Sequence, residues 1–289
     1  MKVIVTKNKK TKAILLTVLA IVILPISIIP VSLNIIGEDN KQEIPILMYH
    51  SMLKSKQCIG QYVVSPDEFE SDINYLEENG YTAIFMQDLI NCVKGESQLP
   101  LKPVIITFDD GYYNNYYYAY KITKEHNIKM VISIIVSQTD LYSENPDENP
   151  NYSHLTWDEI NEMLNSGLVE IANHSYDLHA QNGKYIGVTK AKCESDEEYE
   201  QRLVNDIKKA QDRIFEKTGR TTTTFTYPFG LAGKSTKEII KNMGFDATLL
   251  VENKKASVEI GNDSSLYNLK RCIRVGGAST YKVMKKYKI

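Results

Sequence analysis

Short apolar runs alternate with segments of helical pattern along most of this 289-residue chain, and this alternation most constrains its fold. Several helical segments begin at clear capping signals, for example Ser65 with Glu68 and Ser195 with Glu198. Strands that alternate with helices predict a parallel sheet covered by helices. About seven strands in roughly 245 residues favour an α/β fold of the distorted, incomplete (β/α) barrel type over an open sheet.

The individual elements follow from periodicity and from turn-forming residues. We expect strands at 44–50, 82–86, 103–108, 129–136, 169–172, 222–227, 247–251 and 267–275. We expect helices at 65–80, 88–94, 112–126, 156–165, 195–217 and 237–242, and a short one after 279. The polar segment 137–153 contains two prolines and is expected to be a loop at the rim of the site.

Acidic and histidine side chains stand where two of these strands end. Asp109 and Asp110 follow an apolar run and precede a glycine, which lets the backbone turn sharply and expose both carboxylates. His174 and His179 follow the strand-like run 169–172. In a parallel barrel the carboxyl ends of the strands meet at one mouth, so we expect these side chains to lie close together.

One carboxylate and two imidazoles form the three-ligand set of an open, catalytic zinc-type site. The remaining acid is then free to act as a base toward an attacking water. Taken alone, an Asp-Asp-Gly sequence is most often a turn, and two histidines five residues apart are most often unrelated. His126 and His154 are expected to be an ordinary helix-end residue and an ordinary loop residue. Both motifs follow strand-like runs in a chain with five histidines, so the joint pattern indicates a metal-assisted hydrolase.

The sequences TFDDG (107–111), HSYDLH (174–179) and TYPFG (226–230) resemble the successive motifs of NodB-type polysaccharide deacetylases, carbohydrate esterase family 4. The resemblance covers roughly residues 44–275. The strand ILMYH (46–50) and the five-residue spacing of the motif histidines resemble the branch that acts on poly-N-acetylglucosamine. The resemblance implies a distorted barrel and a hydrolase that removes acetyl groups from a polysaccharide.

The resemblance also implies roles for residues at the matching positions. Asp110, His174 and His179 are expected to bind a divalent metal, with zinc as the expected ion and Co2+ or Ni2+ as substitutes. Asp109 is expected to be the general base. The TYPFG turn is expected to contact the oxyanion and the substrate through three residues: Tyr227, Pro228 and Phe229, the last through its backbone N–H.

The chain departs from many relatives at the general acid and at the cation beside the base. No histidine follows His179, so His50 at the end of the first strand is the expected acid, although a core histidine would look the same in the sequence. Thr226 stands where many relatives carry the arginine that orients the base. Arg271 or Arg274 is expected to supply that cation, with a surface ion pair as the alternative role for either.

The first 36 residues predict a membrane segment. Residues 1–12 carry five lysines and no acid, and residues 13–36 carry no charge over a length that can cross a bilayer as a helix. The positive-inside rule places the lysines in the cytoplasm, so the deacetylase-like domain at 44–289, after a polar linker at 37–43, is expected outside the cell membrane. An uncleaved single-pass anchor is favoured over a signal peptide, whose cleavage would release a secreted domain.

Charge and cysteine content argue against a nucleic-acid-binding protein and against a cysteine-based metalloprotein. The formal charge is −2, and without the N-terminal lysines the rest of the chain carries about −7, which argues against a nucleic-acid partner. The four cysteines are scattered and form no Cys-x-x-Cys pair, which argues against a cysteine-based metal site. The expected partners are therefore a polysaccharide substrate and the membrane, and the oligomeric state is left open.

We therefore expect a membrane-anchored, extracellular de-N-acetylase that acts on an N-acetylglucosamine polymer, either poly-N-acetylglucosamine or peptidoglycan. An O-acetyl polysaccharide esterase would use the same metal site and remains an alternative. A non-catalytic glycan-binding module that kept the barrel predicts lost ligands or a lost base, whereas all four of these residues are present. A scaffold subunit of a membrane export machine is the third alternative.

Overall fold

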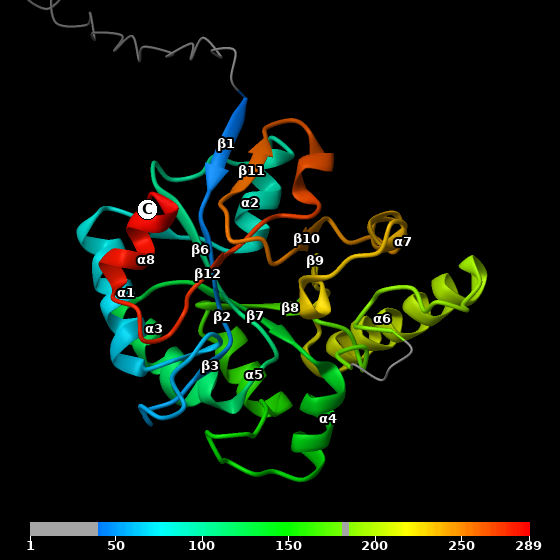
Figure 1. Ribbon diagram of the computed structural model, residues 1–289, viewed down its shortest axis with the longest axis horizontal. Coiled ribbons are helices and arrows are strands. Elements are labelled where there is room, and N and C mark those ends of the chain that lie inside the picture. The colour runs from blue at the N-terminus through cyan, green and yellow to red at the C-terminus, as the bar shows by residue number, and fades with distance from the viewer. Residues whose placement is uncertain (1–39, 181–184) are drawn as a thin grey trace, which may run out of the picture. The chain divides into compact units, whose positions relative to one another are not determined.

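Parallel strands form the centre of the fold, which the computed structural model describes for residues 40–180 and 185–289 (Figure 1). Seven strands follow one another in the order β10-β9-β8-β7-β6-β2-β12, and β5 pairs with β6 beside this path. All of these pairings are parallel. The strands are β2 (Ile46–Tyr49), β5 (Thr82–Ala83), β6 (Pro103–Phe108), β7 (Met130–Ile134), β8 (Val169–Asn173), β9 (Thr224–Thr226), β10 (Ala247–Leu249) and β12 (Cys272–Ile273).

The two ends of this strand order meet in part. Leu269, just before β12, forms a parallel bridge with Leu249 of β10. The backbone N–H of Leu250 donates to the carbonyl oxygen of Leu269 over 2.8 Å, and the N–H of Leu269 donates to the carbonyl oxygen of Thr248 over 2.8 Å. The sheet therefore curves back toward itself, and it fits the distorted, incomplete barrel that the sequence predicts.

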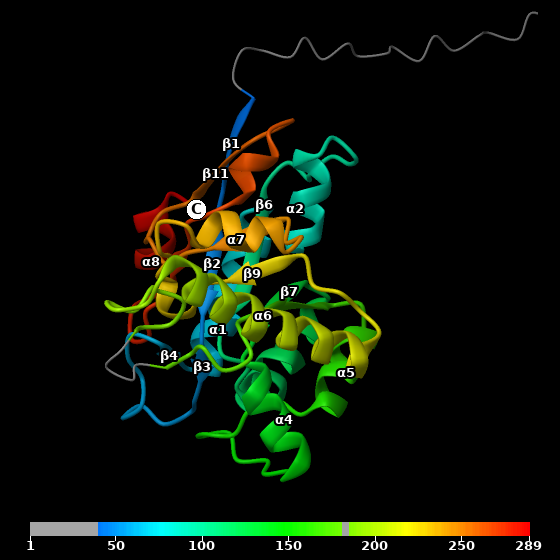
Figure 2. The ribbon, with the colours of Figure 1, turned by 90° about the vertical axis from the view of Figure 1, so that its right-hand side faces the viewer.

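Helices surround the sheet (Figures 1 and 2). Helix α6 packs against β8 between α5 and α7 (Figure 2). The helices are α1 (Pro66–Glu78), α2 (Met86–Val93), the π-helix η1 (Asn115–Tyr120), α3 (Lys121–His126), α4 (Val136–Glu144), α5 (Trp157–Asn165), α6 (Asp196–Thr218), the 3-10 turns η2 (Pro228–Gly230) and η3 (Asp263–Leu266), α7 (Thr236–Asn242) and α8 (Thr280–Tyr287).

Apolar runs bury the strands of the central sheet. Every residue of β2 and β7 is buried, and so is every residue of β6 after the first. Near-continuous apolar strands of this kind are typical of parallel sheets that are covered on both faces. Helix α6 instead buries a single stripe at helical spacing, formed by Tyr199, Leu203, Ile207, Ala210 and Ile214. This packing fixes where each strand ends, and so it positions the residues that follow the strands.

Several of the expected elements differ from the structure. The strand expected at 267–275 has only Cys272 and Ile273 in the sheet, because Leu269 turns toward β10 instead. The loop expected at 137–153 is wrong in its first part, where α4 forms. Its Asp140 accepts hydrogen bonds from Nε1 of Trp157 and Nε of Arg213, each over 2.8 Å, so contacts between distant segments stabilise this polar helix.

The expected basic tail at 1–12 and membrane segment at 13–36 lie outside the described residues. Within 40–180 and 185–289, none of the helices combines the length and the apolar character that a membrane crossing needs. The last residues of the expected linker at 37–43 lie in a strand, since β1 (Lys41–Ile44) pairs antiparallel with β11 (Ala256–Glu259). Three residues of β1 are polar and exposed, and only Ile44 is buried. The sequence therefore shows no apolar run that would predict this strand.

The carboxyl ends of neighbouring strands meet at one mouth of the barrel. His50 directly follows β2, Asp109 follows β6, His174 follows β8 and Tyr227 follows β9. These four strands, with β7 among them, are consecutive in the sheet. Residues from widely separated motifs therefore reach the same end of the barrel, as the strand pattern predicts.

A half-buried carboxyl group, that of Glu170, lies toward the opposite end of the sheet. Glu170, the second residue of β8, accepts a hydrogen bond from the backbone N–H of Gln87 in the first turn of α2, over 3.1 Å. Burial raises the pKa of Glu170 to about 7, although the Gln87 hydrogen bond opposes this shift. Glu170 is therefore neutral in the folded protein at mildly acidic pH.

Folding stability is expected to fall as the pH rises from about 4.5 to about 7, because the unfolded chain loses the Glu170 proton in this range while the folded protein still holds it. Glu170→Gln should remove this loss. We expect it to raise the free energy of unfolding by roughly 1–3 kcal/mol at about pH 8, with little change at about pH 5. Urea unfolding at both pH values measures this, with the exposed Glu200→Gln as control. An equal gain at both pH values would contradict the assignment.

Candidate active site and metal centre

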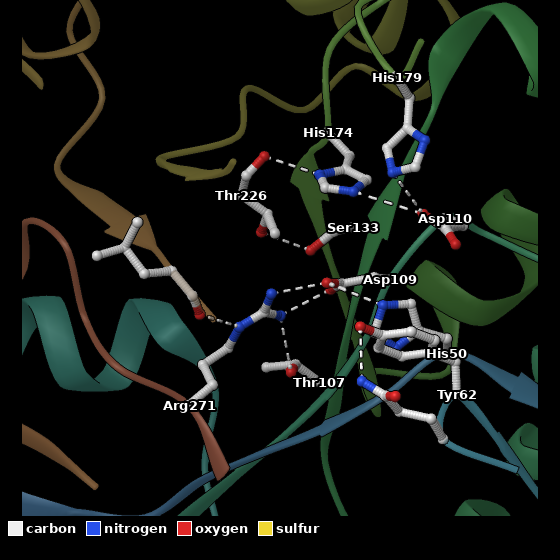
Figure 3. Close-up of polar contacts among 12 residues, drawn as sticks. His50, Tyr62, Thr107, Asp109, Asp110, Ser133, His174, His179, Thr226 and Arg271 are labelled. Carbon is white, nitrogen blue, oxygen red and sulfur yellow. Dashed lines mark hydrogen bonds and ion pairs between the residues drawn. The ribbon is translucent and has the colours of Figure 1, made fainter. Parts of the chain in front are cut away.

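The three expected ligands come together at the mouth of the barrel (Figure 3). Oδ1 of Asp110 lies 3.5 Å from Nε2 of His174 and 3.3 Å from Nε2 of His179. The ligand atoms of the three residues all lie within 4.8 Å of one another. Asp110 and His174 are buried, whereas His179 is partly exposed, so the centre is accessible from one side. This arrangement has the residue types that an open site for a divalent metal requires.

The turn after β6 sends the two neighbouring carboxylates in different directions. Asp110 has a φ of 71° and Gly111 a φ of 69°, and both values are left-handed. A Cβ atom at Gly111 would lie 3.0 Å from Cγ2 of Ile134 and 3.3 Å from its Cα, so the turn requires glycine there. Asp110 contacts the histidines as a result, while Asp109 points to Arg271 (Figure 3).

The hydrogen bond of His174 leaves its second ring nitrogen as an acceptor. Nδ1 donates its N–H to the carbonyl oxygen of Thr226 over 2.7 Å, so in the neutral ring Nε2 carries a lone pair. That lone pair faces Oδ1 of Asp110, a buried atom for which the described residues provide no hydrogen-bond partner. Two facing acceptors need a cation between them, so this donor set fits a divalent metal.

The pKa values of the three residues depend on burial and on the charges of their neighbours. Burial raises the pKa of Asp110, but the neighbouring His174 outweighs burial and holds the pKa well below its usual range. Burial lowers the pKa of His174, and Asp110 and Asp109 together raise it above its usual value. Burial prevails at His179, and the charge of His174 lowers the pKa of His179 further. His179 is therefore kept neutral, which is the form that binds a metal.

Asp109 forms a buried, bidentate ion pair with Arg271. Nη1 donates to Oδ1 and Nη2 donates to Oδ2, each over 2.7 Å, and Arg271 is fully buried. Nε of Arg271 donates to the carbonyl oxygen of Leu250 over 2.9 Å, and Nη1 donates to Oγ1 of Thr107 over 3.3 Å. Burial raises the pKa of Asp109, but the charge of Arg271 and its hydrogen bonds outweigh burial and lower it. The pair therefore keeps an ionised carboxylate at the cavity.

Arg274, the other candidate for the cation, does not reach Asp109. Its Nε donates to Oδ2 of Asp72 on α1 over 2.5 Å, and the Thr280 hydroxyl donates to the same carboxylate over 2.6 Å. Both Arg274 and Asp72 are buried, so this is not a surface ion pair either. Arg271 and Arg274 are three positions apart and face opposite sides of the strand, so only Arg271 can point to the base.

His50 lies on the other side of Asp109 (Figure 3). Its Nε2 is 3.8 Å from Oδ2 of Asp109, and its ring centre is 4.7 Å from that of Tyr62. The side chain lines the cavity and is 16% exposed. Burial lowers the pKa of His50, while the charges of Asp109 and Asp110 act in the opposite direction. His50 is placed where it could exchange a proton with a bound group, and its catalytic role stays a prediction.

The TYPFG turn brings one of its three expected residues into the cavity. Phe229 has a left-handed φ of 58°, and its ring centre is 4.3 Å from that of His179. Tyr227 is fully buried and belongs to the apolar cluster beneath α6, and Pro228 is buried as well. Tyr227 and Pro228 do not line the cavity, because the strand directs Tyr227 into the core, and their expected contact with the oxyanion or substrate stays a prediction.

A cavity of about 350 Å3 unites these residues. It is lined by His50, Ser51, Tyr62, Val63, Asp109, Asp110, Tyr112, His174, His179, Phe229, Gly230 and Val251. The cavity combines the three candidate metal ligands, the ionised carboxylate of Asp109 and the imidazole of His50, and aromatic side chains line it. Such groups together can activate a water molecule and protonate a leaving group.

His154 is a site residue that sequence reasoning missed. It was expected to be an ordinary loop residue, yet its Nδ1 donates to the backbone carbonyl oxygen of Asp110 over 3.0 Å. Its ring centre is 4.8 Å from that of Tyr112, which lines the cavity. His126 does end α3 as expected, and it pairs with Glu77 over 3.0 Å. No local motif marks His154, because its contact depends on a bridge between two distant segments.

Comparison with known proteins places this site in context. Residues 96–248 match the family model described as polysaccharide deacetylase. The Bacillus subtilis protein YxkH is 28% identical over 236 residues, which cover 82% of this chain and 73% of YxkH. The poly-beta-1,6-N-acetyl-D-glucosamine N-deacetylase of Staphylococcus aureus is 27% identical over 203 residues, which cover 69% of this chain and 65% of that protein, less than two thirds of its length.

A solved structure is similar over most of the chain. A de-N-acetylase from Aggregatibacter actinomycetemcomitans superposes with a TM-score of 0.69 at 28% identity, and the match covers 83% of this chain and 99% of that one. The family model includes the TFDDG, HSYDLH and TYPFG motifs, whereas His50 and Arg271 lie outside the residues that it matches.

Arg271→Met should destabilise the protein strongly, because the buried carboxylate of Asp109 would lose its partner. We expect the free energy of unfolding to fall by about 3–5 kcal/mol. The double variant Arg271→Met/Asp109→Asn should recover most of this loss, since no unpaired charge then remains buried. Urea unfolding of the wild type, both single variants and the double variant measures the coupling. Equal stability of Arg271→Met and the double variant would refute a strong ion pair.

Proposed function

The chain belongs to the polysaccharide deacetylase family, and from this membership we propose that it is a metal-dependent hydrolase that removes N-acetyl groups from an N-acetylglucosamine polymer outside the cell membrane. One observation carries the proposal. The Asp110–His174–His179 set and the Asp109–Arg271 pair line or adjoin a single cavity. A module that only bound glycan would not need an ionised base beside a complete set of ligands.

Asp110, His174 and His179 are the residues that would hold the metal. When bound, a divalent ion such as zinc would lower the pKa of a water molecule and polarise the acetamide carbonyl. The carbonyl of Thr226 orients His174 for this role through the hydrogen bond to Nδ1. Nitrogen and oxygen ligands also suit Co2+ and Ni2+, which we propose as substitutes.

Asp109 would take the proton of the attacking water. Arg271 keeps this carboxylate ionised, which a base requires, and holds both of its oxygens in a fixed orientation. The same pairing lowers the intrinsic basicity of Asp109. The effect of this base must therefore come from its position beside the metal ligands rather than from a raised pKa.

His50 would protonate the leaving amine. Cleavage of the amide bond leaves a nitrogen that must gain a proton, and His50 lines the cavity 3.8 Å from Asp109. Burial disfavours the protonated ring, and the neighbouring Asp109 charge favours it. His50 is thus the group we propose in place of the C-terminal histidine that many relatives use.

Phe229 would contribute to the stabilisation of the oxyanion through its backbone N–H. The residue lines the cavity beside His179. Its left-handed backbone turns the chain sharply at that point. A backbone donor near the developing negative charge would add to the effect of the metal.

N-acetylglucosamine polymers are the proposed substrate class. The similar protein of Staphylococcus aureus is named for poly-beta-1,6-N-acetyl-D-glucosamine, and the similar structure is that of a de-N-acetylase. Peptidoglycan carries the same acetamido sugar and fits the same chemistry. The uncharged residues 13–36, which follow five lysines, support a single-pass anchor with the domain outside the membrane. Cleavage of this segment would instead make the domain a secreted enzyme.

Metal-stripped full-length protein in detergent should release acetate from N-acetylglucosamine oligomers only after zinc or cobalt is restored. Asp109→Asn should slow this release by about 10²–10⁴-fold, because the attacking water would lose its base. The exposed Asp158→Asn is the matched control and should keep the wild-type rate. Acetate release with and without metal, together with a zinc-binding measurement, tests both statements.

The other outcomes of this experiment favour other functions. Release from an O-acetylated polysaccharide, but from neither glucosamine oligomers nor peptidoglycan, would favour the esterase. Metal binding without release from any of these would favour a glycan-binding module. Absence of metal binding would overturn the proposed metal site.

If His50 is the acid, His50→Ala should affect the hydrolysis rates of two substrates differently. We expect amide cleavage to slow by about 10²–10⁴-fold, because the amine cannot leave without a proton. Hydrolysis of 4-nitrophenyl acetate should change little, because 4-nitrophenolate leaves as an anion. Rates on both substrates are compared with those of His126→Ala, a histidine outside the cavity. An equal loss on both substrates would exclude the proposed role.

A further inference from the structure

A distant segment supports the turn that carries Asp110. The backbone N–H of Tyr113 donates to the carbonyl oxygen of Ser153 over 2.8 Å, and the N–H of Leu155 donates to the carbonyl oxygen of Gly111 over 2.9 Å. Both bonds lie just after Asp110, the residue that has the left-handed φ of 71°. The segment 153–155 therefore lies along the turn and can fix its peptide planes.

His154 adds a side-chain hydrogen bond between these two backbone bonds. Its Nδ1 lies 3.0 Å from the carbonyl oxygen of Asp110, and since a carbonyl can only accept, Nδ1 carries the proton. The ring lies between two tyrosines, with centres 4.8 Å from Tyr112 and 5.6 Å from Tyr142. This packing holds the N–H in one direction.

Tyr112 lies next to both His154 and the cavity. Its ring packs against His154, and it lines the cavity together with Asp110. Neither His154 nor Tyr112 belongs to the ligand set itself.

We propose that His154 is a positioning residue for the metal centre, because its Nδ1–H holds the Asp110 carbonyl and thereby aims the Asp110 carboxylate at His174 and His179. This inference rests on the proposed metal site. The carbonyl carbon and Cβ are both bonded to the Cα of Asp110, so a shift of this backbone segment after loss of the hydrogen bond would move the carboxylate. Oδ1 would then leave its place 3.5 Å and 3.3 Å from the two imidazole nitrogens.

Two substitutions separate the hydrogen bond from the ring packing. His154→Phe keeps an aromatic ring between the tyrosines and removes the donor. His154→Asn loses the ring and keeps an N–H near the position of Nδ1. We expect the zinc affinity of the full-length protein to fall by about 10–100-fold in His154→Phe and to stay within about threefold of wild type in His154→Asn. His126→Phe is the control and should bind zinc like the wild type.

Zinc affinity is measured by competition with a chromophoric chelator, and the visible absorption spectrum of the Co2+ form reports the ligand geometry. His154→Phe should alter that spectrum, and His154→Asn should preserve it. Each variant is first compared with the wild type by its melting temperature in chelator. Should His154→Phe prove unfolded, His154→Gln, whose amide reaches the Nε2 position instead, is expected to show the same loss.

Wild-type zinc affinity and an unchanged Co2+ spectrum in folded variants that lack the donor would overturn the proposal. So would weak binding by His154→Asn with normal binding by His154→Phe, because the effect would then come from ring packing. Failure of the wild-type protein to bind zinc is a separate result, which would overturn the proposed function and this inference with it.

Discussion

The buried pair of Asp109 and Arg271 ties the fold to the candidate site. Arg271 lies just before β12 and reaches across β2 to the residue that follows β6. Its Nε also binds the carbonyl of Leu250, just after β10, so one guanidinium connects both ends of the strand order. Two charges buried this deeply are tolerated only when they are paired and hydrogen-bonded. The barrel therefore closes around this pair, and that closure brings the candidate ligands, base and acid to one mouth.

Two adjacent carboxylates would repel each other if they shared one environment. The left-handed turn avoids this by giving them different partners, a guanidinium for Asp109 and imidazoles for Asp110. Burial raises the pKa of both acids, and in each case the partner outweighs burial. Both stay ionised for different reasons. In the proposed mechanism this separation lets one acid act as a ligand and the other as a base.

Residues that directly follow strands could be predicted from the sequence, because an apolar strand fixes where its carboxyl end lies. The sheet, most helices and the grouping of the three candidate ligands were therefore anticipated. The choice between Arg271 and Arg274 was not, because both strand residues between them, Cys272 and Ile273, are apolar and do not reveal which face points inward. Helix α4 and the contact of His154 depend on pairing between distant segments, which leaves no local periodicity.

The mouth divides into two halves on either side of β6. The histidine ligands come from the β8 side. There the carbonyl oxygen of Thr226 orients His174, and the hydroxyl of Thr226 forms a hydrogen bond of 2.7 Å with the hydroxyl of Ser133. His50 and Arg271 come from β2 and from the residue before β12, on the opposite side of β6 in the sheet order. The cation beside Asp109 therefore comes from the β12 side, while Thr226 on the β9 side contacts His174 and Ser133 instead. In the proposed mechanism, changes on the β2–β12 side would alter proton transfer without touching a ligand, because His50 and Arg271 lie on that side and the two histidine ligands do not.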